Sequence, residues 1–536
     1  MVGNRRQASR AWIIILIIAV LTILPIILNQ VGVLGVDSYF QYNRIYEAEM
    51  QIRHGNFSFL NLYSFQQAGR IVNQVYSPLL TFLFGAILLV TGTWFKFQIV
   101  SMILVNFFAG ISMYYGAKKL KFNFAICVAL ASIYMTSFSI YGFMYSTSWR
   151  ALAVAFVPLL IGPMKAFYSG DWTLREMLFL GVIVGIIAQA QIISAALVLP
   201  ILVPFFVIGL IKTQSKWRAL SLPIISLFFY GALAALLLFW RTLSGFTKTL
   251  TIMAVVYLVL GTNLVPWSII GLQWPALESY LQLPRRFIIT GLSFLFLSDM
   301  LVVQELRLNG VFHWTQAGIK LLTTIVATSA VVSLAVAAAT FVARQSDPNI
   351  SIAAGLGTND NNVFAHRYHG KKIKTITDLQ PVFHVKDKSA LIQVVDRRTP
   401  DYVPIQGNYS TSTDYYSAYV RYVISPKSKF HHQVLPGGVL RLTWNQKRAR
   451  QIRVPVVVYG NTQVILNGEM LAHKELRPSI ISTPMVHGKR GANHIDLSYQ
   501  PKMMTVISIW WSVLAWVIVG LSTIKYCLFN RQIKRG

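Results

Sequence analysis

Long apolar runs alternate with short polar stretches over the first 344 residues. A helix needs roughly 17–25 apolar residues to cross a bilayer. Runs of this kind lie at 11–29, 98–117, 122–141, 151–168, 176–193, 195–212, 219–240, 287–304, 321–343 and 504–528. Two further runs, 78–94 and 250–272, contain Pro or Gly and are ambiguous. The pattern predicts an α-helical membrane bundle of about ten to twelve transmembrane helices.

The distribution of Lys and Arg decides how the two ambiguous runs are interpreted, because cytoplasmic loops are enriched in both residues. If neither run crosses, the basic clusters at 118–121 and 212–218 fall on the cytoplasmic side, as do both chain termini. We therefore predict that 78–94 and 250–272 are re-entrant or interfacial segments. In this topology the loop 30–77, the turn 142–150 and the region 241–286 meet at the outer face.

Beyond Arg344 the pattern changes from long apolar runs to short alternating ones. Residues 345–503 are polar and carry the turn signals Gly460-Asn461 and Asn467-Gly468 between the runs. The alternation predicts an extracytoplasmic antiparallel β-sandwich. A last transmembrane helix and a cytoplasmic tail follow within 504–536. The predicted domains are thus 1–344, 345–503 and 504–536.

Composition supports a multi-pass protein of the cell membrane. The chain has 536 residues, of which 55% are hydrophobic and 12% are charged, with a formal net charge of +30. Positive loops explain part of this charge, and the remainder favours contact with membrane lipid headgroups or phosphate-bearing substrates. No basic tract carries a nucleic-acid motif, so no nucleic-acid partner is expected. The two cysteines lie in apolar runs, and the histidine pairs lack partners at ligand spacing, so we expect no metal site.

The polar stretch 35–54, directly after the first apolar run, contains the candidate chemistry. Asp37, Gln41 and Arg44 are spaced i, i+4, i+7 and so share one face of a helix. Asp37 has two readings, as a helix N-cap and as a catalytic carboxylate. Four of the eight carboxylates before residue 345 face outward in the predicted topology, namely Asp37, Glu47, Glu49 and Glu278. Asp37 is the nearest of them to the membrane boundary and to Arg44.

Further candidates are the cations and aromatic residues predicted at the outer face. Arg44, Arg150, Arg285 and Arg286 suit either phosphate binding or interfacial snorkelling. Arg285 and Arg286 are the more informative pair, because basic residues are disfavoured on that side. The aromatic residues suit either stacking on sugar faces or an interfacial belt; they are Tyr39, Tyr42, Tyr145, Trp149 and Trp274.

Several segments together resemble one known family. They are GVDSYFQYNRI, YSPLLTFLFGAILLVTG, SWRALAVAFVPLLIG and LQLPRRFIITGLSFLFL. The chain resembles the YfhO-like branch of the GT-C superfamily of bacterial polytopic membrane glycosyltransferases, over most of the membrane region and in the outer β-domain. The resemblance implies a polyprenyl-phosphate-linked sugar donor and a catalytic base in the first external loop, at Asp37. The branch often has His four residues later, where this chain has Gln41, which cannot take up a proton.

The implied reaction transfers a sugar to an extracytoplasmic acceptor, such as a cell-wall polymer or glycolipid. Asp37 would act as general base, and Gln41, Arg44, Arg150, Arg285, Arg286, Glu278, Trp149 and Trp274 would bind substrate. No Asp-x-Asp pair is present in the first loop, so a divalent cation is compatible with the site but not required. Two other functions remain open: a transporter or flippase of lipid-linked saccharides, and a non-catalytic membrane scaffold that presents the β-domain.

Overall fold

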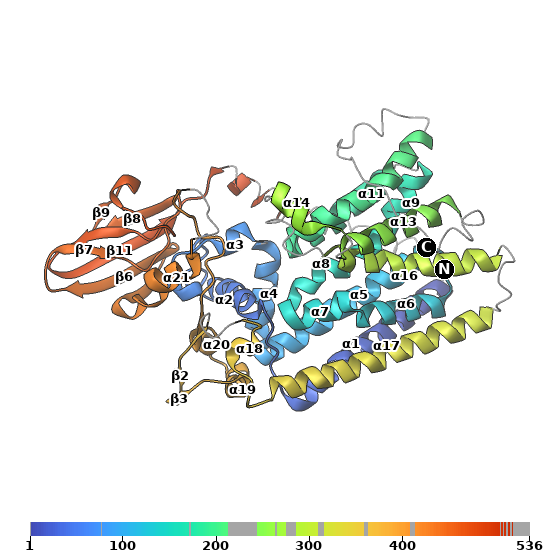
Figure 1. Ribbon diagram of the computed structural model, residues 1–536, viewed down its shortest axis with the longest axis horizontal. Helices are drawn as coiled ribbons and strands as arrows, with labels where there is room; N and C mark the ends of the chain where they lie inside the picture. Colours follow the sequence, from blue (N-terminus) through green and yellow to red (C-terminus); the bar gives the residue numbers. More distant parts are fainter. Residues whose placement is uncertain are drawn as a thin grey trace, which may run out of the picture. The chain divides into compact units, whose positions relative to one another are not determined.

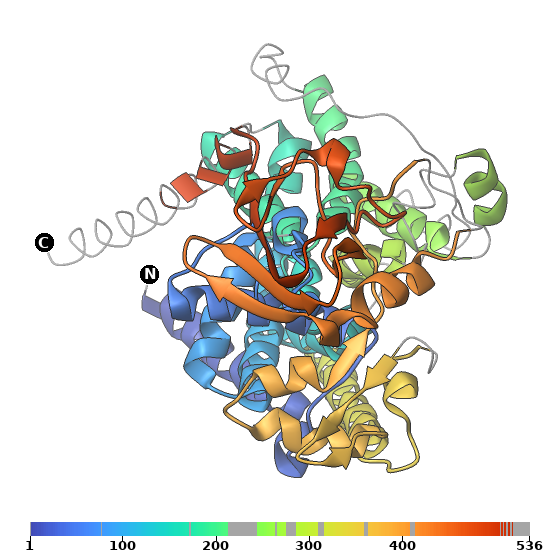
Figure 2. The same ribbon diagram turned by 90° about the vertical axis from the view of Figure 1, so that its left-hand side faces the viewer.

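The structure is a computed structural model that describes residues 2–76, 78–170, 173–212, 244–262, 265–274, 286–308, 316–358, 363–407 and 413–503, with eight residues between 505 and 517. The chain forms two compact units. The helical unit contains Met1–Glu49 and Tyr76–Arg397, and the β unit contains Met50–Val75 and Arg398–Gly536. The ribbon diagrams show the helices in blue to yellow and the strands of the β unit in orange to red (Figures 1 and 2).

The helical unit is a bundle of long apolar helices, consistent with the predicted membrane domain. Six described segments are long and apolar enough to cross a membrane: Arg6–Asn29, Trp94–Lys119, Phe124–Tyr145, Trp149–Ser169, Ile192–Gly209 and Thr323–Gln345. The helices are α1 (Val2–Asn29), α2 (Ser38–His54, which continues into the β unit), α4 (Pro78–Thr91), α5 (Trp94–Lys119), α6 (Phe124–Thr136), α7 (Phe138–Thr147), α8 (Leu152–Ala155), α9 (Ile161–Ser169), α10 (Leu174–Ala190), α11 (Ile192–Lys212), α13 (Gly245–Leu260), α14 (Trp267–Gln273), α16 (Arg286–Leu308) and α17 (Gln316–Gln345). Figure 1 shows α1 and α17 side by side. The predicted span 219–240 lies outside the described residues, as does most of 504–528.

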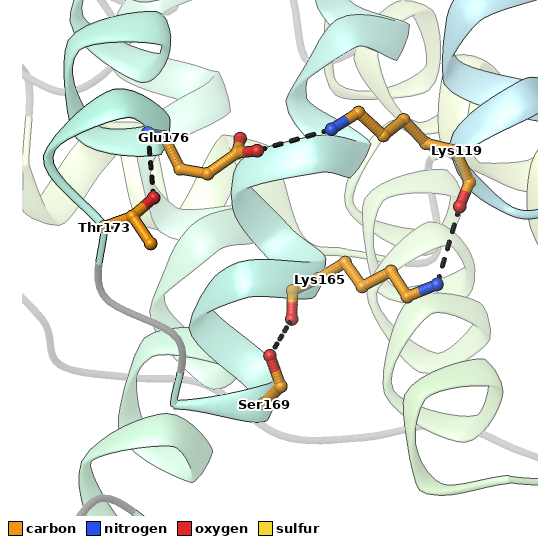
Figure 3. A network of polar contacts seen from close by, with 5 residues as sticks. All are labelled: Lys119, Lys165, Ser169, Thr173 and Glu176. Atoms are coloured by element: carbon orange, nitrogen blue, oxygen red, sulfur yellow. Dashed lines mark hydrogen bonds and ion pairs between the residues drawn. The ribbon is translucent and has the colours of Figure 1, made fainter. Parts of the chain in front are cut away.

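One end of the bundle gathers lysines and is here called the cationic end. Lys119, the last residue of α5, forms an ion pair with Glu176 in the first turn of α10, at 3.3 Å (Figure 3). Lys165 of α9 donates to the backbone oxygen of Lys119 at 3.5 Å. Thr173 caps α10, because its hydroxyl accepts from the backbone N–H of Glu176 at 3.3 Å. These contacts bring the ends of α5 and α9 and the start of α10 together.

The start of α13 also lies at the cationic end, which corrects the predicted topology. Lys212, at the end of α11, lies 3.6 Å from the ring centroid of Tyr168, and Tyr168 makes an edge contact with Phe246. Ser244 donates its hydroxyl to Glu305, near the end of α16, at 2.7 Å. Residues 212 and 244 therefore lie at the same end of the bundle. The predicted outer placement of 241–286 is wrong for its first residues.

The chain reaches the opposite end of the bundle through α13. A Cβ atom on Gly261 would lie 2.1 Å from Ile288, so the end of α13 touches the start of α16. Trp267 of α14 stacks on Phe287 with ring centroids 5.7 Å apart. Helix α13 is therefore antiparallel to α16, and it runs from the cationic end to the opposite end, here called the site end. The run 250–272 thus contains most of α13, which is shorter than the six candidate membrane spans, and the short helix α14 at the site end.

Helix α4 is shorter than the six candidate membrane spans and packs along α2. Its 14 residues span about 21 Å, less than the roughly 30 Å of a bilayer core. A Cβ atom on Gly85 would lie 2.8 Å from both the Cβ atom of Ala48 and the backbone nitrogen of Glu49, so α4 packs closely along α2. Phe84 contacts Phe97 of α5, with ring centroids 6.2 Å apart. These contacts place α4 beside α2 and the start of α5.

The β unit is built from two antiparallel sheets around one apolar core. Its strands are β5 (His431–Leu435), β6 (Val439–Gln446), β7 (Arg450–Arg453), β8 (Thr462–Leu466), β9 (Glu469–Met470), β10 (Met485–Gly488) and β11 (Gly491–Tyr499). The larger sheet has the order β5-β6-β11-β8-β9, and β10 pairs with β7. The core takes residues from both sheets, such as Leu442 and Val486. Asn467-Gly468 forms the predicted two-residue hairpin between β8 and β9, with φ of 52° and 94°. Gly460-Asn461 forms a turn before β8, but does not join two paired strands.

The division between units differs from the predicted boundary at 344. Residues 345–397 belong to the helical unit, with α18 (Ile352–Gly355), α19 (Ile376–His384), α20 (Ser389–Gln393) and the short strands β1 (Val363–Ala365), β2 (Arg367–Tyr368), β3 (Lys371–Lys372) and β4 (Val395–Arg397). The side chain of Gln345 donates to the oxygen of Leu34 at 3.1 Å, and that of Gln380 accepts from the N–H of Gly32 at 2.7 Å. These bonds tie the segment to the loop after α1.

The first external loop is also divided. Residues 50–75 belong to the β unit, where Leu60 and Leu62 enter the core. The buried guanidinium of Arg70 donates to the oxygen of Thr399 at 2.8 Å and to the oxygen of Asp401. Short helices α3 (Val72–Val75) and α21 (Tyr415–Tyr419) complete this unit.

The corrected topology predicts which introduced cysteines share one side of the membrane. The two native cysteines are first replaced. Lys121→Cys and Ser244→Cys are then expected to behave alike toward an impermeant maleimide: both react in intact cells, or both react only after the cells are permeabilised. Gln273→Cys, at the end of α14, is expected to react under the opposite condition and is the control. Reaction of Ser244→Cys together with Gln273→Cys would contradict this topology.

Candidate functional site

The candidate site begins where the chain enters α2. The backbone oxygen of Asp37 accepts from the N–H of Gln41 at 3.0 Å, so Asp37 occupies the N-cap position. Its side chain does not act as the cap. Carboxylate Oδ2 accepts instead from Nη1 of Arg150 at 2.8 Å. The N-cap interpretation therefore holds for the backbone of Asp37, while its carboxylate is available for another role.

Arg150 comes to Asp37 from a distant part of the sequence, the 3-10 turn Ser148–Ala151. Trp149 anchors this turn by stacking on Phe84 of α4, with ring centroids 4.9 Å apart. The side chain of Arg150 is 10% exposed and that of Asp37 is 39% exposed. The guanidinium is therefore mostly withdrawn from solvent, whereas the carboxylate can be reached from outside.

Arg44 is fully buried behind this ion pair. Its guanidinium donates to Oε1 of Gln41 at 2.8 Å, to Oγ1 of Thr81 at 2.5 Å and to the backbone oxygen of Tyr76. It also lies 4.3 Å from the ring centroid of Tyr76 and 5.4 Å from that of Trp149. The structure thus brings together Asp37, Gln41, Arg44, Trp149 and Arg150, five of the residues that the sequence singles out.

Three buried donors in this cluster have no hydrogen-bond acceptor within the described part of the chain. They are Nε2 of Gln41, Nε1 of Trp149 and Nε of Arg150. A buried polar group without a partner costs about 1–3 kcal/mol, so such groups are rare and call for an explanation. Donors gathered beside an accessible carboxylate suit a ligand rich in acceptor oxygens, such as a phosphate or a sugar.

Interactions behind α2 fix its position. The side chain of Gln98 in α5 donates to the oxygen of Val33 at 2.8 Å and accepts from the N–H of the same residue at 3.0 Å. The hydroxyl of Tyr42 donates to the oxygen of Val33 at 2.7 Å, and burial raises the pKa of this hydroxyl well above its usual value. Tyr39, Tyr42 and Tyr145 are core residues whose rings are buried, which argues against the stacking alternative for these three.

Asp37 differs from the other predicted outer carboxylates that the structure describes. Glu47 and Glu49 are both fully buried. Oε1 of Glu49 lies 3.3 Å from Nζ of the buried Lys388, and the oxygen of Lys388 accepts from the indole N–H of Trp94 at 2.9 Å. Glu49 therefore stabilises the packing at the site end, while Asp37 is the carboxylate that a substrate can reach.

Other predicted site residues lie elsewhere or outside the described residues. Glu278 and Arg285 fall in 275–285, which the structure does not describe. Trp274 follows α14 and is 63% exposed, and Arg286 is the first residue of α16. In the described part of the chain, no three His, Cys, Asp or Glu side chains gather to hold a metal ion.

Tyr76 and Thr81 are site residues that the sequence did not indicate. Tyr76 supplies both a backbone acceptor and an aromatic face to Arg44, and Thr81 supplies a hydroxyl. The available signal was a polar, Pro-containing break at the start of an ambiguous apolar run.

Comparison with models of known protein families, with curated proteins and with solved structures found no match.

The two arginines are predicted to affect stability very differently. Arg44→Met leaves the three acceptors of its guanidinium without that donor and should lower the free energy of unfolding by on the order of 3 kcal/mol. Arg150→Gln removes an ion pair whose carboxylate is partly solvated and should cost less than about 1 kcal/mol. Denaturation of the purified protein in detergent, followed by tryptophan fluorescence, measures both. Equal destabilisation by the two substitutions would contradict this assignment.

Proposed function

We propose that the protein is a membrane glycosyltransferase of the GT-C type. It transfers a sugar from a polyprenyl-phosphate-linked donor to an extracytoplasmic acceptor, a cell-envelope polymer or a glycolipid, with Asp37 as general base. The observation that supports this proposal most strongly is the exposed carboxylate of Asp37 beside a buried arginine and three buried donors that lack acceptors. This is the combination that a phosphate leaving group and an acceptor hydroxyl require.

The orientation of the bundle follows from its charges. The cationic end carries Lys119, Lys165 and Lys212, and the positive-inside rule favours the cytoplasm for such an end. The site end is then extracytoplasmic, and both chain termini are cytoplasmic. A lipid-linked donor would reach the site from the outer leaflet, with its phosphate at the depth of the headgroups.

The chemical step is a single displacement at the anomeric carbon. The acceptor hydroxyl oxygen forms the new bond to this carbon, and the bond to the donor phosphate oxygen breaks. The hydroxyl proton passes to Asp37. Polyprenyl phosphate leaves with the bonding electron pair, its charge balanced by Arg150 and by the buried donors. Because the nucleophile enters opposite the leaving group, the anomeric configuration inverts.

The ion pair between Asp37 and Arg150 gives the site an order of events. In the structure Nη1 of Arg150 donates to Oδ2 of Asp37, so this carboxylate oxygen is engaged. A donor phosphate competes for the same guanidinium. When the phosphate binds Arg150, the carboxylate of Asp37 is released and can accept the proton of the acceptor hydroxyl. Gln41 holds Arg44 through its oxygen, and its amide nitrogen can donate to the donor sugar or phosphate.

The proposal predicts that Asp37→Asn abolishes transfer without removing the protein. General-base catalysis contributes about 10²–10⁴-fold, so the rate should fall by at least about a hundredfold, because the amide cannot accept the proton. The measurement is glycosylation of envelope polymers in cells that carry the variant, normalised to protein level. Asp387→Asn, the same change at an exposed carboxylate that accepts from the N–H of Ser389, is the matched control.

A gene deletion gives the baseline for this measurement. If Asp37→Asn accumulates normally and retains the wild-type glycan profile, which the deletion loses, Asp37 is not the base. If Asp37→Ala is unstable while Asp37→Asn is active, the side chain serves to hold Arg150 through a hydrogen bond and does not need to take up a proton.

A further inference from the structure

The β unit carries a concentration of positive charge of its own. Residues 398–503 contain 14 Lys and Arg against 5 Asp and Glu. Five of these cations lie in two short loops taken with their flanking strand residues, 446–450 between β6 and β7, and 488–491 between β10 and β11; they are Lys447, Arg448, Arg450 (the first residue of β7), Lys489 and Arg490. All five are exposed, and neither loop contains a carboxylate. We refer to the two loops as the basic loop pair.

Two buried amide side chains hold the basic loop pair together. Nε2 of Gln446 donates to the oxygen of Gly488 and, at 3.5 Å, to that of Arg450. Nδ2 of Asn493 donates to the oxygens of Lys489 and Gly491 at 2.8 Å and 3.0 Å, and its Oδ1 accepts from the N–H of Lys489 at 2.8 Å. The register places Gln446 opposite Gly491, and Arg450 opposite Gly488. The loops are therefore held side by side despite the repulsion between their charges.

Gly488 shows how closely the loops approach each other. A Cβ atom at this position would lie 2.6 Å from Nε2 of Gln446, so a side chain would displace the Gln446 amide from its place between the loops. The nearest carboxylate along β11, Asp496, does not neutralise the loops. It is bound by Arg441 of β6 through two hydrogen bonds of 2.6 Å. The charge of the basic loop pair is thus left for a ligand.

An open pocket of about 660 Å³ with polar and apolar lining residues adjoins these loops through Asn445 and Asn493. It lies next to the part of β6 and β11 that extends past His431, the first residue of β5, so that β6 there has no β5 residue beside it. His431, Thr443 and His494 stand in one row across the three strands, because Thr443 pairs with both histidines. Asn445 and Lys429 also line the pocket. Its volume falls in the usual range for ligand sites, and its lining offers hydrogen-bond donors and acceptors as well as positive charge.

We propose that the basic loop pair and this pocket form a binding site for a linear polyanion, a chain with repeated phosphate or carboxylate groups. The five cations bind successive anionic groups, and the pocket takes the polar part of one repeat. A polymer fits better than a bilayer surface, because loops that enter a bilayer carry large apolar side chains. Neither 446–450 nor 488–491 contains one. The site is independent of the proposed glycosyl transfer.

The test is binding of fluorescent linear inorganic polyphosphate to the full-length protein in phosphatidylcholine nanodiscs, measured by anisotropy. A variant with Lys447→Gln, Arg448→Gln, Lys489→Gln and Arg490→Gln should bind at least about tenfold more weakly, because several charge contacts are lost together. The matched control replaces four exposed cations elsewhere in the unit, Arg421, Lys474, Arg477 and Lys502, with Gln. It changes the net charge equally and should lose less than about twofold.

A pocket variant and a lipid arm complete the experiment. Asn445→Asp places a negative charge in the pocket and should weaken binding severalfold with the loops intact. Equal losses for the loop variant and the control would mean that net charge alone attracts the probe, and would overturn the proposal. Wild-type protein that binds polyphosphate no more tightly than the loop variant would also overturn the proposal. If phosphatidylglycerol nanodiscs in addition protect the loops from trypsin, the loops bind lipid headgroups instead. Asp37→Asn should bind polyphosphate like wild type, which separates this proposal from the proposed activity.

Discussion

A buried guanidinium organises the site end of the helical unit. A charged group can be buried only where hydrogen bonds replace its lost hydration, and Arg44 obtains them from Gln41 of its own helix, Thr81 of α4 and the chain at Tyr76. The same group lies against the ring of Trp149, the residue before Arg150. Arg44 therefore fixes three segments relative to one another. The ion pair between Asp37 and Arg150 depends on that arrangement.

The two arginines perform different tasks although they lie close together. Arg44 is held by neutral oxygens and an aromatic face, in a place where its loss would leave those acceptors unsatisfied. Arg150 is held by a carboxylate that is partly solvated, and such a pair exchanges partners at low cost. A rigid cation beside an exchangeable one suits phosphoryl recognition, because one positions the site and the other can move onto the ligand. The basic loop pair of the β unit shows a related design, with buried amides as the fixed part and exposed cations as the binding part.

Local periodicity predicted the elements of the site that lie close together in the sequence. The i, i+4, i+7 spacing correctly placed Asp37, Gln41 and Arg44 on one side of α2, and Asn467-Gly468 correctly indicated a hairpin. The partner of Asp37 could not be predicted in the same way, because Arg150 is 113 residues away. Interfacial snorkelling explains an arginine in that turn equally well. For Tyr76 and Thr81 the sequence offered only a Pro-containing break, since their roles depend on how α4 packs against α2.

The domain boundary and the topology were predicted less well, for physical reasons. Hydropathy measures the length of an apolar run but not the end of the bundle at which the run starts. It therefore could not show at which end 250–272 begins. The β core takes Leu60 and Leu62 from the first loop, where the surrounding sequence is polar and lacks a long alternation. Conversely, Gln345 and Gln380 bind the loop after α1, and so the segment 345–397 belongs to the helices. Single buried amides and leucines determine these boundaries, and composition averages over them.

The central claim is that a donor phosphate takes Arg150 from Asp37. Its most direct test is the affinity of polyprenyl phosphate for the protein in nanodiscs, measured by native mass spectrometry for wild type, Arg150→Gln and Asp37→Asn. The account predicts that Arg150→Gln binds at least about tenfold more weakly, because a charge-assisted contact is lost. Asp37→Asn should bind as tightly as wild type or more tightly, because the carboxylate no longer competes for the guanidinium. A loss of affinity in Asp37→Asn as large as that in Arg150→Gln would contradict the account.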